Sequence, residues 1–388
     1  MRFLMALLLF IPISIILHFT GASDVVMFVV AGLAIVPLAG YIGIATDELA
    51  KYVGPSVGGL LNATFGNATE LIIAVIALHS GKTEIVKASI IGSIIGNLLL
   101  VLGLSILLGG LKHKTQSFSR DMAGMYAATL TLATIAFLVP ALFVRSAGMG
   151  AEPSNLSALH LSYGVSGILI LLYIGSLIFS LKTHEHLMVC EEEETDPPRW
   201  SKSKAILVLF ASAVAVGLES EFLVGAIDTV VKQWHFTEVF IGIIVIPVIG
   251  NAAEHSAAVM LALKNKMDLS YSIAVSSSTQ VAMFVAPFAV FAGALMHNPA
   301  LAAHPMTIIF TAHELIAIAV SVFIVSLIAL DGKCHWLEGA QLLAVYAIIA
   351  MSFFFIAKDP AAAPAGENHK ALSSPPPQSS AAPEAGSK

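Results

Sequence analysis

Long hydrophobic blocks separated by short polar stretches make up most of this chain. Each block has about 20 residues, which is enough for an α-helix to cross the hydrocarbon core of a bilayer. Apolar and polar positions do not alternate within the blocks, so the pattern predicts helices and not the strands of a barrel. We predict eleven spans, at residues 3–20, 24–45, 56–79, 84–109, 121–144, 156–181, 203–227, 237–263, 269–296, 305–330 and 337–357.

The composition agrees with this fold class, an all-α polytopic integral membrane protein. Of 388 residues, 57% are hydrophobic and only 11% are charged, which is far more apolar surface than a soluble protein needs. We therefore expect the apolar surface of the chain to contact the lipid bilayer. The net charge of -6 comes mostly from loop and tail acids, so nothing here points to a nucleic-acid partner.

The distribution of Lys and Arg orients the chain in the membrane. With a cytoplasmic amino terminus, most of these residues fall in inner loops, as the positive-inside rule requires, and the carboxyl terminus lies outside. We expect the inner (cell) membrane of a bacterium. A cleaved signal peptide is the alternative for the first span, but the apolar run is longer than a usual signal core, which favours a retained helix. The basic residues left in outer loops are Lys82, Lys87, Arg145 and Lys232.

The two halves of the chain resemble each other at a constant offset of 184 residues. The segment 66–70, which reads GNATE, recurs as GNAAE at 250–254. The alternative is chance similarity between Gly- and Ala-rich helices. Because polar residues match as well, a true repeat is favoured. Each half has five spans, and an odd number reverses the orientation of the second copy. We therefore predict one leading helix and two inverted five-helix repeats.

These patterns divide the chain into five parts. Residues 1–23 form the leading helix, and residues 24–181 and 205–357 form the two repeats. An acidic cytoplasmic linker, 182–204, joins the repeats and carries four consecutive glutamates at 191–194. The tail, 358–388, is rich in Pro, Ala, Ser and Gly, and such a composition predicts disorder.

Two carboxylates lie at the centres of predicted spans, Glu70 and Glu254. An ionised carboxylate there costs on the order of 2.5 to 3.5 kcal/mol on insertion scales, so each needs a functional reason. Asn67 and Asn251 each precede a glutamate by three residues, which puts amide and carboxylate on one helical face. We predict that Glu70, Glu254, Asn67 and Asn251 form one site for a cation and protons.

The donors of this site are all hard oxygen atoms, which suit Ca²⁺ better than zinc or copper. Gly66 and Gly250 stand where they would loosen the helix just before each carboxylate, so that freed backbone carbonyls can join the ligands. Neighbouring spans add polar side chains at helical spacing, for which direct ligation and interhelical hydrogen bonding are equally open. These supporting residues are Ser93, Asn97, Ser277 and Gln280.

The paired motifs GNATE (66–70) and GNAAEH (250–255), with LLNATF (60–65) before the first, resemble the signature repeats of the calcium/cation antiporter superfamily. Within it, the chain is similar to the calcium/proton exchanger family from about residue 24 to 357. The resemblance implies eleven spans with two inverted repeats. It also implies that Glu70 and Glu254 bind Ca²⁺ and alternately carry protons.

The same resemblance implies two further acids near the cavity mouths, at Asp47 and Glu221. The chain departs from the family pattern in having Asp47 where Glu is expected. It also has Ser276 where a glycine would mirror Gly92. The resemblance gives no role to Glu219. His255, which follows Glu254, either tunes that carboxylate or packs, and packing is the commoner role for a lone histidine in a span.

The function predicted from these features is antiport of cytoplasmic Ca²⁺ against H⁺. Two carboxylates in an apolar cavity repel each other, so a cation or protons must neutralise them, and the two substrates compete for one site. Ca²⁺ is the transported substrate, no cofactor is expected, and the chain is not expected to be an enzyme. The alternatives are a sodium-driven calcium/cation exchanger, a passive channel and an intramembrane diacid protease. The oligomeric state stays open, a homo-oligomer included.

Overall fold

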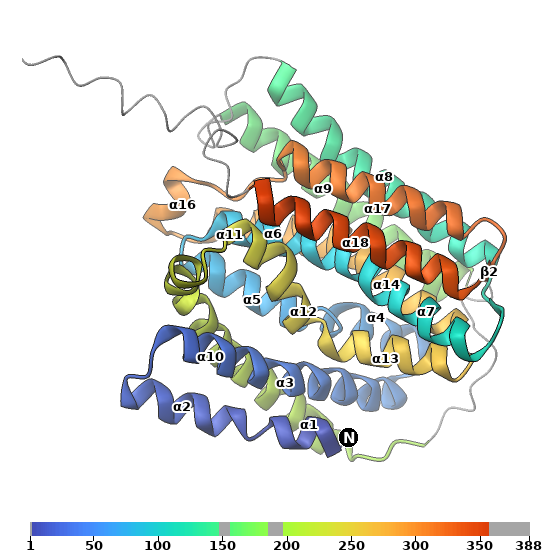
Figure 1. Cartoon of the computed structure of the whole chain (residues 1–388), viewed down its shortest axis with the longest axis horizontal. Helices are drawn as coiled ribbons and strands as arrows, with labels where there is room; N and C mark the ends of the chain where they lie inside the picture. Colours follow the sequence, from blue (N-terminus) through green and yellow to red (C-terminus); the bar gives the residue numbers. More distant parts are fainter. Residues whose placement is uncertain (1, 147–155, 185–196, 357–388) are drawn as a thin grey trace, which may run out of the picture.

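A computed structural model describes residues 2–146, 156–184 and 197–356. Apart from one short β ladder, the regular secondary structure of the described chain is helical (Figure 1). The four linker glutamates and the tail 358–388, predicted to be solvated and disordered, lie outside the described residues. The elements in chain order are α1 (Arg2–Leu7), α2 (Phe10–Thr20), α3 (Asp24–Val53), α4 (Pro55–Phe65), α5 (Ala68–His79), α6 (Thr83–Ile95), η1 (Gly96–Val101), α7 (Leu102–Lys112), β1 (Gln116–Ser117), α8 (Arg120–Ser146), α9 (Leu156–Ile178), η2 (Phe179–Thr183), α10 (Lys202–Trp234), α11 (Glu238–Phe240), η4 (Ile241–Val245), α12 (Ile246–Gly250), α13 (Ala252–Leu263), α14 (Met267–Gln280), η5 (Val281–Val285), α15 (Ala286–Leu295), α16 (Pro299–Ala303), α17 (Ala312–Ile328), β2 (Lys333–Cys334) and α18 (Trp336–Ile356).

The predicted spans coincide with helices, although their lengths differ. Within the described ranges, seven helices are long and apolar enough to cross a membrane, or up to nine if each of two bent pairs is one span. Two shorter apolar helices, Met5–Thr20 and Ala312–Ile328, occupy the remaining predicted positions. The chain is therefore an integral membrane protein with an all-helical membrane domain. The count of eleven crossings stays a prediction.

The predicted span 305–330 is wrong at its start, because helix α17 begins only at Ala312. A capping box fixes this start: the Thr311 hydroxyl accepts from the Glu314 backbone N–H (3.4 Å), while the Glu314 carboxylate accepts from the Thr311 backbone N–H (2.8 Å). The first predicted span is also interrupted between α1 and α2. Pro12, which has no backbone N–H, cannot complete the helical bond to the Leu8 carbonyl.

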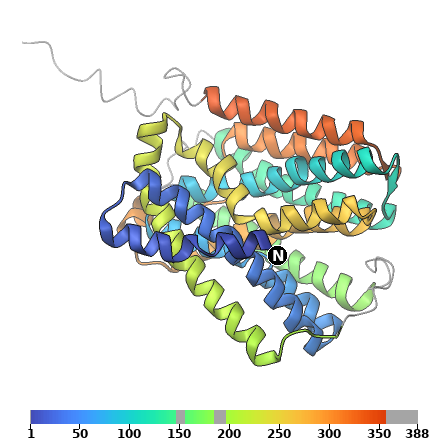
Figure 2. The same ribbon diagram turned by 60° about the horizontal axis from the view of Figure 1, so that its bottom comes forward.

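The helices form layers (Figures 1 and 2). The long helices α3 and α10 pack along each other on one side, and α2 packs on both of them. Helices α8, α17 and α18 lie on the opposite side of the molecule (Figure 1). The two bent helix pairs and the continuous helices that follow them, 83–112 and 267–295, lie between these layers. This middle layer carries the polar residues of the predicted site.

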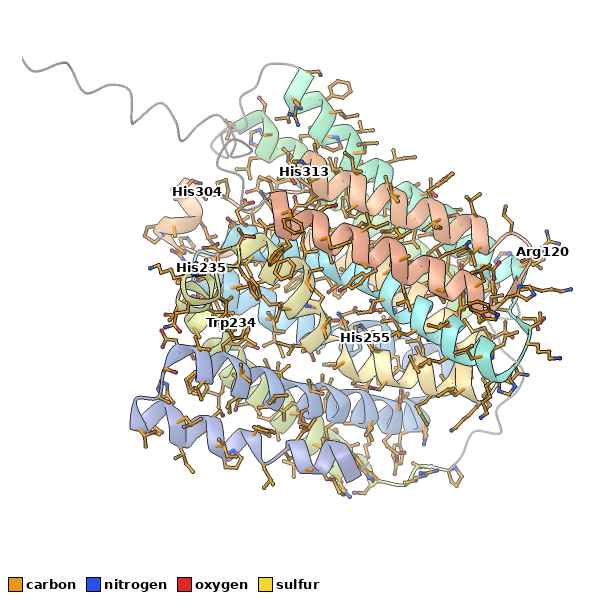
Figure 3. All side chains as sticks on the ribbon, in the orientation of Figure 1. Arg120, Trp234, His235, His255, His304 and His313 are labelled. Carbon is orange, nitrogen blue, oxygen red and sulfur yellow. The ribbon has the colours of Figure 1, made fainter. Side chains whose placement is uncertain are left out.

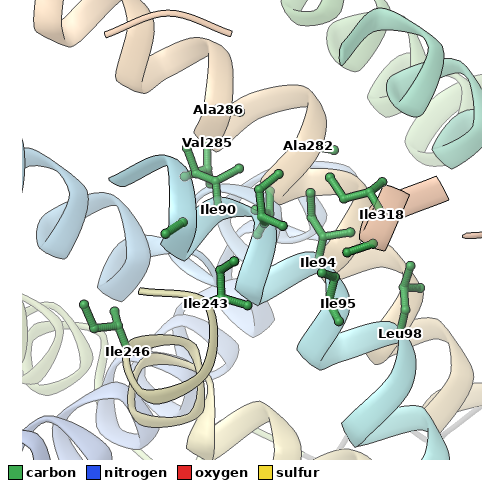
Figure 4. Close-up of a cluster of buried hydrophobic side chains, with 14 of the residues drawn as sticks. Ile90, Ile94, Ile95, Leu98, Ile243, Ile246, Ala282, Val285, Ala286 and Ile318 are labelled. Atoms are coloured by element: carbon green, nitrogen blue, oxygen red, sulfur yellow. The ribbon is translucent and has the colours of Figure 1, made fainter. Parts of the chain in front are cut away.

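The two continuous helices of the middle layer contribute many side chains to the apolar core, which residues from most other helices complete. Figure 4 shows part of this cluster, with Ile94, Leu98 and Ala282 from the two helices and Ile243, Ile246 and Ile318 from others. Each helix changes to a π-helix at an equivalent place in the two halves, at η1 and η5. π-Helical turns of this kind are frequent at functional sites, because they rotate the side chains that follow.

Loops that the sequence assigns to one side of the membrane meet at one end of the bundle. At the predicted cytoplasmic end, β1 pairs antiparallel with β2. This pairing joins the loop after α7 to the loop after α17. Gln116 Nε2 in the first of these loops donates to the Ala262 carbonyl near the end of α13 (2.8 Å). The Ser119 backbone N–H donates to the Asp268 carboxylate at the start of α14 (2.6 Å).

At the opposite end, Asn298 Nδ2 donates to the His79 carbonyl (2.6 Å), and Lys82 forms an ion pair with Asp228. Figure 3 shows His235 and His304 at this end and Arg120 at the other. The grouping of these loops follows the predicted sidedness. Which end faces the cytoplasm stays a prediction.

The segment that enters α10 is fixed to the end of α3 by one buried carboxylate. Glu48, only 5% exposed, accepts hydrogen bonds from the backbone N–H groups of Arg199 (2.6 Å) and Trp200 (2.8 Å). Lys51 Nζ lies 2.8 Å from the same carboxylate, and the Tyr52 hydroxyl donates to the Trp200 carbonyl (2.6 Å). These contacts tie the end of the acidic linker to α3.

We expect Glu48→Ala to free this segment, because two backbone N–H groups lose a charged acceptor worth about 1.5 to 3 kcal/mol each. Tryptic cleavage at Arg199 in detergent should become at least about tenfold faster. Glu84→Ala, which removes an exposed glutamate of an ion pair at the opposite end, is the control and should leave this cleavage rate unchanged. Equal rates in the wild type and Glu48→Ala would show that other contacts hold the segment.

Candidate ion-binding site

Two breaks in membrane helices face each other in the middle layer. The pair α4–α5 bends by 40° around Gly66 and Asn67, and the pair α12–α13 bends by 62° around Asn251. The two asparagines have nearly the same backbone conformation, with φ -98° and ψ 17° at Asn67 and φ -98° and ψ 6° at Asn251. Each asparagine stands at the N-cap position of the half-helix that follows.

Glu70 and Glu254 are each the third residue of their half-helices, α5 and α13. A carboxylate in the first turn is favoured by the positive end of the helix dipole. The half-helices run from the site toward opposite ends of the molecule, since α5 ends beside Asn298 and α13 ends beside Gln116. Both carboxyl groups therefore enter one central region from opposite directions.

Each glutamate lies beside the helix break of the other half, and Glu70 lines a cavity together with Pro247 and Gly250. A Cβ atom added at Gly66 would lie 3.8 Å from Glu254 Oε1, so this carboxylate reaches the break in the other half. A Cβ atom at Gly250 would lie 4.0 Å from the side chain of Thr69, the neighbour of Glu70. The structure thus brings together Glu70, Glu254 and both glycines, which lie 184 residues apart in the two halves of the sequence.

The asparagine side chains do not cap their helices, although Asn is a preferred N-cap residue. Asn67 Nδ2 donates instead to the Ala63 carbonyl (3.4 Å) and to Gln280 Oε1 in α14. Asn251 Nδ2 donates to the Pro247 carbonyl and to Ser93 Oγ in α6 (both 3.1 Å). Each break is therefore fixed to a continuous helix of the other half.

The remaining supporting residues complete this polar layer. Asn97 Nδ2 donates to Ser277 Oγ (2.9 Å), and Ser277 also hydrogen-bonds Glu254. The structure shows interhelical hydrogen bonds for Ser93, Asn97, Ser277 and Gln280. Their direct ligation of an ion stays a prediction.

Four buried oxygen atoms of the site have no hydrogen-bond partner: Asn67 Oδ1, Asn251 Oδ1, Glu70 Oε2 and Glu254 Oε2. Leaving a buried acceptor unpaired costs about 1 to 3 kcal/mol, so four together are a costly arrangement in a membrane domain. Both asparagine amide groups use their donors on the protein and keep their oxygen free. This donor set fits a hard cation such as Ca²⁺, which takes carboxylate and amide oxygen ligands.

Glu70, which carries one of these oxygens, also lines a small cavity. Its volume is about 10 Å³, and its lining includes Glu70, Ser89, Ser93, Pro247 and Gly250. A space of that size holds about one water molecule. A hydrated cation does not fit this space, so a cation there would depend on protein oxygens for coordination. Within the described ranges, no cluster of three or more His, Cys, Asp or Glu side chains offers a different kind of metal site.

The other predicted site residues lie outside this central group. Asp47 in α3 accepts a hydrogen bond from Asn62 in α4, one helical turn before Gly66. Glu221 in α10 is exposed. His255 lies near the centre of the molecule (Figure 3), and its buried Nε2 has no hydrogen-bond partner. The cavity-mouth roles of the two acids and the tuning role of His255 stay predictions.

Sequence reasoning missed two contacts that shape the site. The Tyr173 hydroxyl in α9 donates to the Ala63 carbonyl (3.1 Å), the same carbonyl that binds Asn67. Asn62 was noted within the motif but not as the partner of Asp47. No spacing rule finds such partners, because Tyr173 lies 110 residues from Ala63.

Comparisons with known proteins cover both halves of the chain. Residues 23–182 and 204–355 match the family model described as sodium/calcium exchanger protein. A Ca²⁺/H⁺ antiporter of Aphanothece halophytica is 47% identical over 367 residues, 90% of this chain and 95% of the relative. The Ca²⁺/H⁺ antiporter ChaA of Bacillus subtilis (strain 168) is 44% identical over 351 residues, 89% of this chain and 97% of the relative. The solved structure of native YfkE is similar with a TM-score of 0.77 and 41% identity, covering 91% of this chain and 99% of that chain.

Proposed function

This chain belongs to the sodium/calcium exchanger protein family, and we propose that it exchanges cytoplasmic Ca²⁺ for H⁺ at one site shared by Glu70 and Glu254. Relatives at 44% and 47% identity over about nine-tenths of the chain are Ca²⁺/H⁺ antiporters, so the chain is a transporter and not an enzyme. This excludes the diacid protease. The observation that carries the shared site is the group of four unpartnered oxygens around the two helix breaks.

Exchange follows from the charge of the site. Two ionised carboxylates without a cation repel each other and lack the water that would stabilise them. One Ca²⁺ neutralises both, and so do two protons, because each carboxyl group then carries no charge. Only the neutral forms pass through the occluded state at low cost, since an uncompensated charge in the membrane interior is expensive. Ca²⁺ release on one side therefore requires proton uptake there, which couples the two fluxes.

The protein holds the ligands while the helices around them move. Asn67 and Asn251 keep the two breaks in register with α14 and α6 through their amide donors. The opposite directions of α5 and α13 support an inverted repeat, in which the site is equally reachable from either side of the membrane. We further propose eleven crossings, with the amino terminus in the cytoplasm and the carboxyl terminus outside, in the inner membrane of a bacterium.

Ca²⁺ flux in proteoliposomes tests this function. A pH jump that leaves the vesicle interior acidic should drive Ca²⁺ uptake against its gradient as protons leave, and the opposite jump should drive Ca²⁺ out. A collapse of the pH gradient by an ionophore should stop both. A sodium jump of the same size at constant pH should drive no flux. Uptake driven by sodium alone would identify a sodium-driven exchanger, and Ca²⁺ movement only down its own gradient would identify a channel.

A further inference from the structure

One carboxyl group in the middle of a membrane helix has no role in this exchange scheme. Glu219 lies in α10 and is 1% exposed. Its Oε1 lies 2.5 Å from Ser14 Oγ of the leading helix α2, and Ser14 is completely buried. An acidic side chain inside a membrane domain is rare and demands a named partner and a function. Here the partner comes from the helix that precedes both repeats.

The hydrogen bonds around Ser14 indicate where the protons are. Ser14 Oγ lies 2.7 Å from the Ile11 carbonyl of its own helix and 2.5 Å from Glu219 Oε1. A hydroxyl group has one proton to donate, and a carbonyl oxygen can only accept. If Ser14 donates its proton to an ionised Glu219, no proton is left between Ser14 Oγ and the Ile11 carbonyl oxygen, so two acceptor oxygens are in short contact. If Glu219 is protonated, it donates to Ser14, Ser14 donates to Ile11, and each contact is a hydrogen bond.

The second carboxyl oxygen favours the same arrangement. Glu219 Oε2 is buried and has no hydrogen-bond partner. A bare oxygen of an ionised carboxylate in an apolar interface costs far more than the bare carbonyl oxygen of a neutral carboxylic acid. The charged residues of α3, which packs on both helices, lie near its ends: Asp24 at one, and Asp47, Glu48 and Lys51 at the other. On α2, His18 stacks on Phe222 at a ring distance of 4.6 Å.

We propose that Glu219 is a protonated docking residue outside the transport site, which donates a hydrogen bond to Ser14 and so holds the leading helix α2 on α10. The stacked rings of His18 and Phe222 lie one helical turn further along the same two faces, since 14 and 18 are four residues apart and 219 and 222 are three. The leading helix is then a fixed part of the fold, attached by a neutral hydrogen-bonded chain.

This docking bears on the helix beside the transport site. A Cβ atom added at Gly217 of α10 would lie 3.9 Å from Ile72 of α5, the half-helix that carries Glu70. Gly217 and Glu219 are two residues apart and point to different sides of α10. The helix α10 is therefore held between α5 and α2, and Glu219 positions α10 through its outer face. Glu219 does not touch the transported ion, so it is a positioning residue.

A cross-linking reporter tests the docking. In a variant without Cys190 and Cys334, His18→Cys and Phe222→Cys place two thiols at the observed ring contact, and the rate of disulfide formation reports the attachment of α2. Glu219→Gln mimics a protonated carboxyl group in shape and donor, so its cross-linking rate and its Ca²⁺ flux should match the parent. Glu219→Ala and Ser14→Ala should cross-link about threefold to tenfold more slowly, the range of interhelical hydrogen bonds in membranes.

Infrared spectroscopy tests the proton directly. At saturating Ca²⁺, where the transport carboxylates are ionised, the spectrum of the parent should contain a carboxylic-acid carbonyl band that Glu219→Gln lacks. The proposal is overturned if this band is the same in both proteins. It is also overturned if Glu219→Gln cross-links as slowly as Glu219→Ala, which would require an ionised carboxylate, or if Glu219→Ala cross-links at the parent rate. If Glu219→Ala fails to fold, the infrared comparison of Glu219→Gln with the parent still tests whether Glu219 is protonated.

Discussion

Glu70→Gln or Glu254→Gln is expected to reduce proton-driven Ca²⁺ flux to the level of protein-free liposomes. Each change keeps the size of the side chain but removes one negative charge, so Ca²⁺ in the apolar cavity is only half neutralised. The amide also cannot take up and release a proton. If the two carboxylates act as one site, as proposed, the double variant should be no worse than either single variant.

The matched variants separate charge from shape. Glu70→Asp and Glu254→Asp keep the charge and shorten the reach, so some flux should remain. Glu84→Gln removes a glutamate whose side chain is 55% exposed in the first turn of α6, and this variant should exchange Ca²⁺ like the wild type. Thermal unfolding in detergent shows that each variant is folded before flux is measured. Near wild-type exchange by either central Gln variant would make the shared-carboxylate mechanism wrong.

Gly92→Ala is expected to give the largest loss of stability. An added Cβ atom would lie 2.1 Å from the Ile243 carbonyl oxygen and 2.6 Å from the Pro247 ring, so α6 and η4 could not remain at their observed distance. The obstacle is mostly backbone, which cannot turn aside as a flexible side chain does. Overpacking of this kind costs about 1 to 3 kcal/mol, and here we expect the upper end. Thermal unfolding in detergent measures the loss.

Gly96→Ala is the control for this prediction, because an added Cβ atom at Gly96 would meet nothing within 4 Å. Alanine is also the better helix former by about 1 kcal/mol, so the stability of this variant should be unchanged or slightly higher. Ca²⁺ flux of Gly92→Ala should fall as well, since Pro247 and Gly92 lie beside the break that positions Glu254. Equal melting temperatures for the two variants would show that α6 and η4 can separate at little cost.

The sequence by itself determined the membrane class and the approximate positions of the membrane helices, and it singled out Glu70 and Glu254 as the candidate site. These depend on local properties: a hydrophobic block long enough to cross a bilayer is visible in one window, and a glutamate inside such a block is conspicuous because lipid disfavours charge. The exact repetition of Gly, Asn and Glu at one offset then related the two halves. The family model matches both halves and confirms the predicted family, while the repeat itself stays a prediction.

Only the tertiary structure decided which polar groups meet. Asn67 binds Gln280, 213 residues away, and Ser14 binds Glu219, 205 residues away. Helical spacing gives the face of a residue on its own helix but not the partner that packs on that face. The start of α17 at Ala312 escaped prediction for a related reason, because the residues 304–311 are apolar enough to span but are held in an irregular segment by the capping box of Thr311 and Glu314. Hydrophobicity fixes what lies in the membrane, whereas packing and hydrogen bonding between distant helices fix the site.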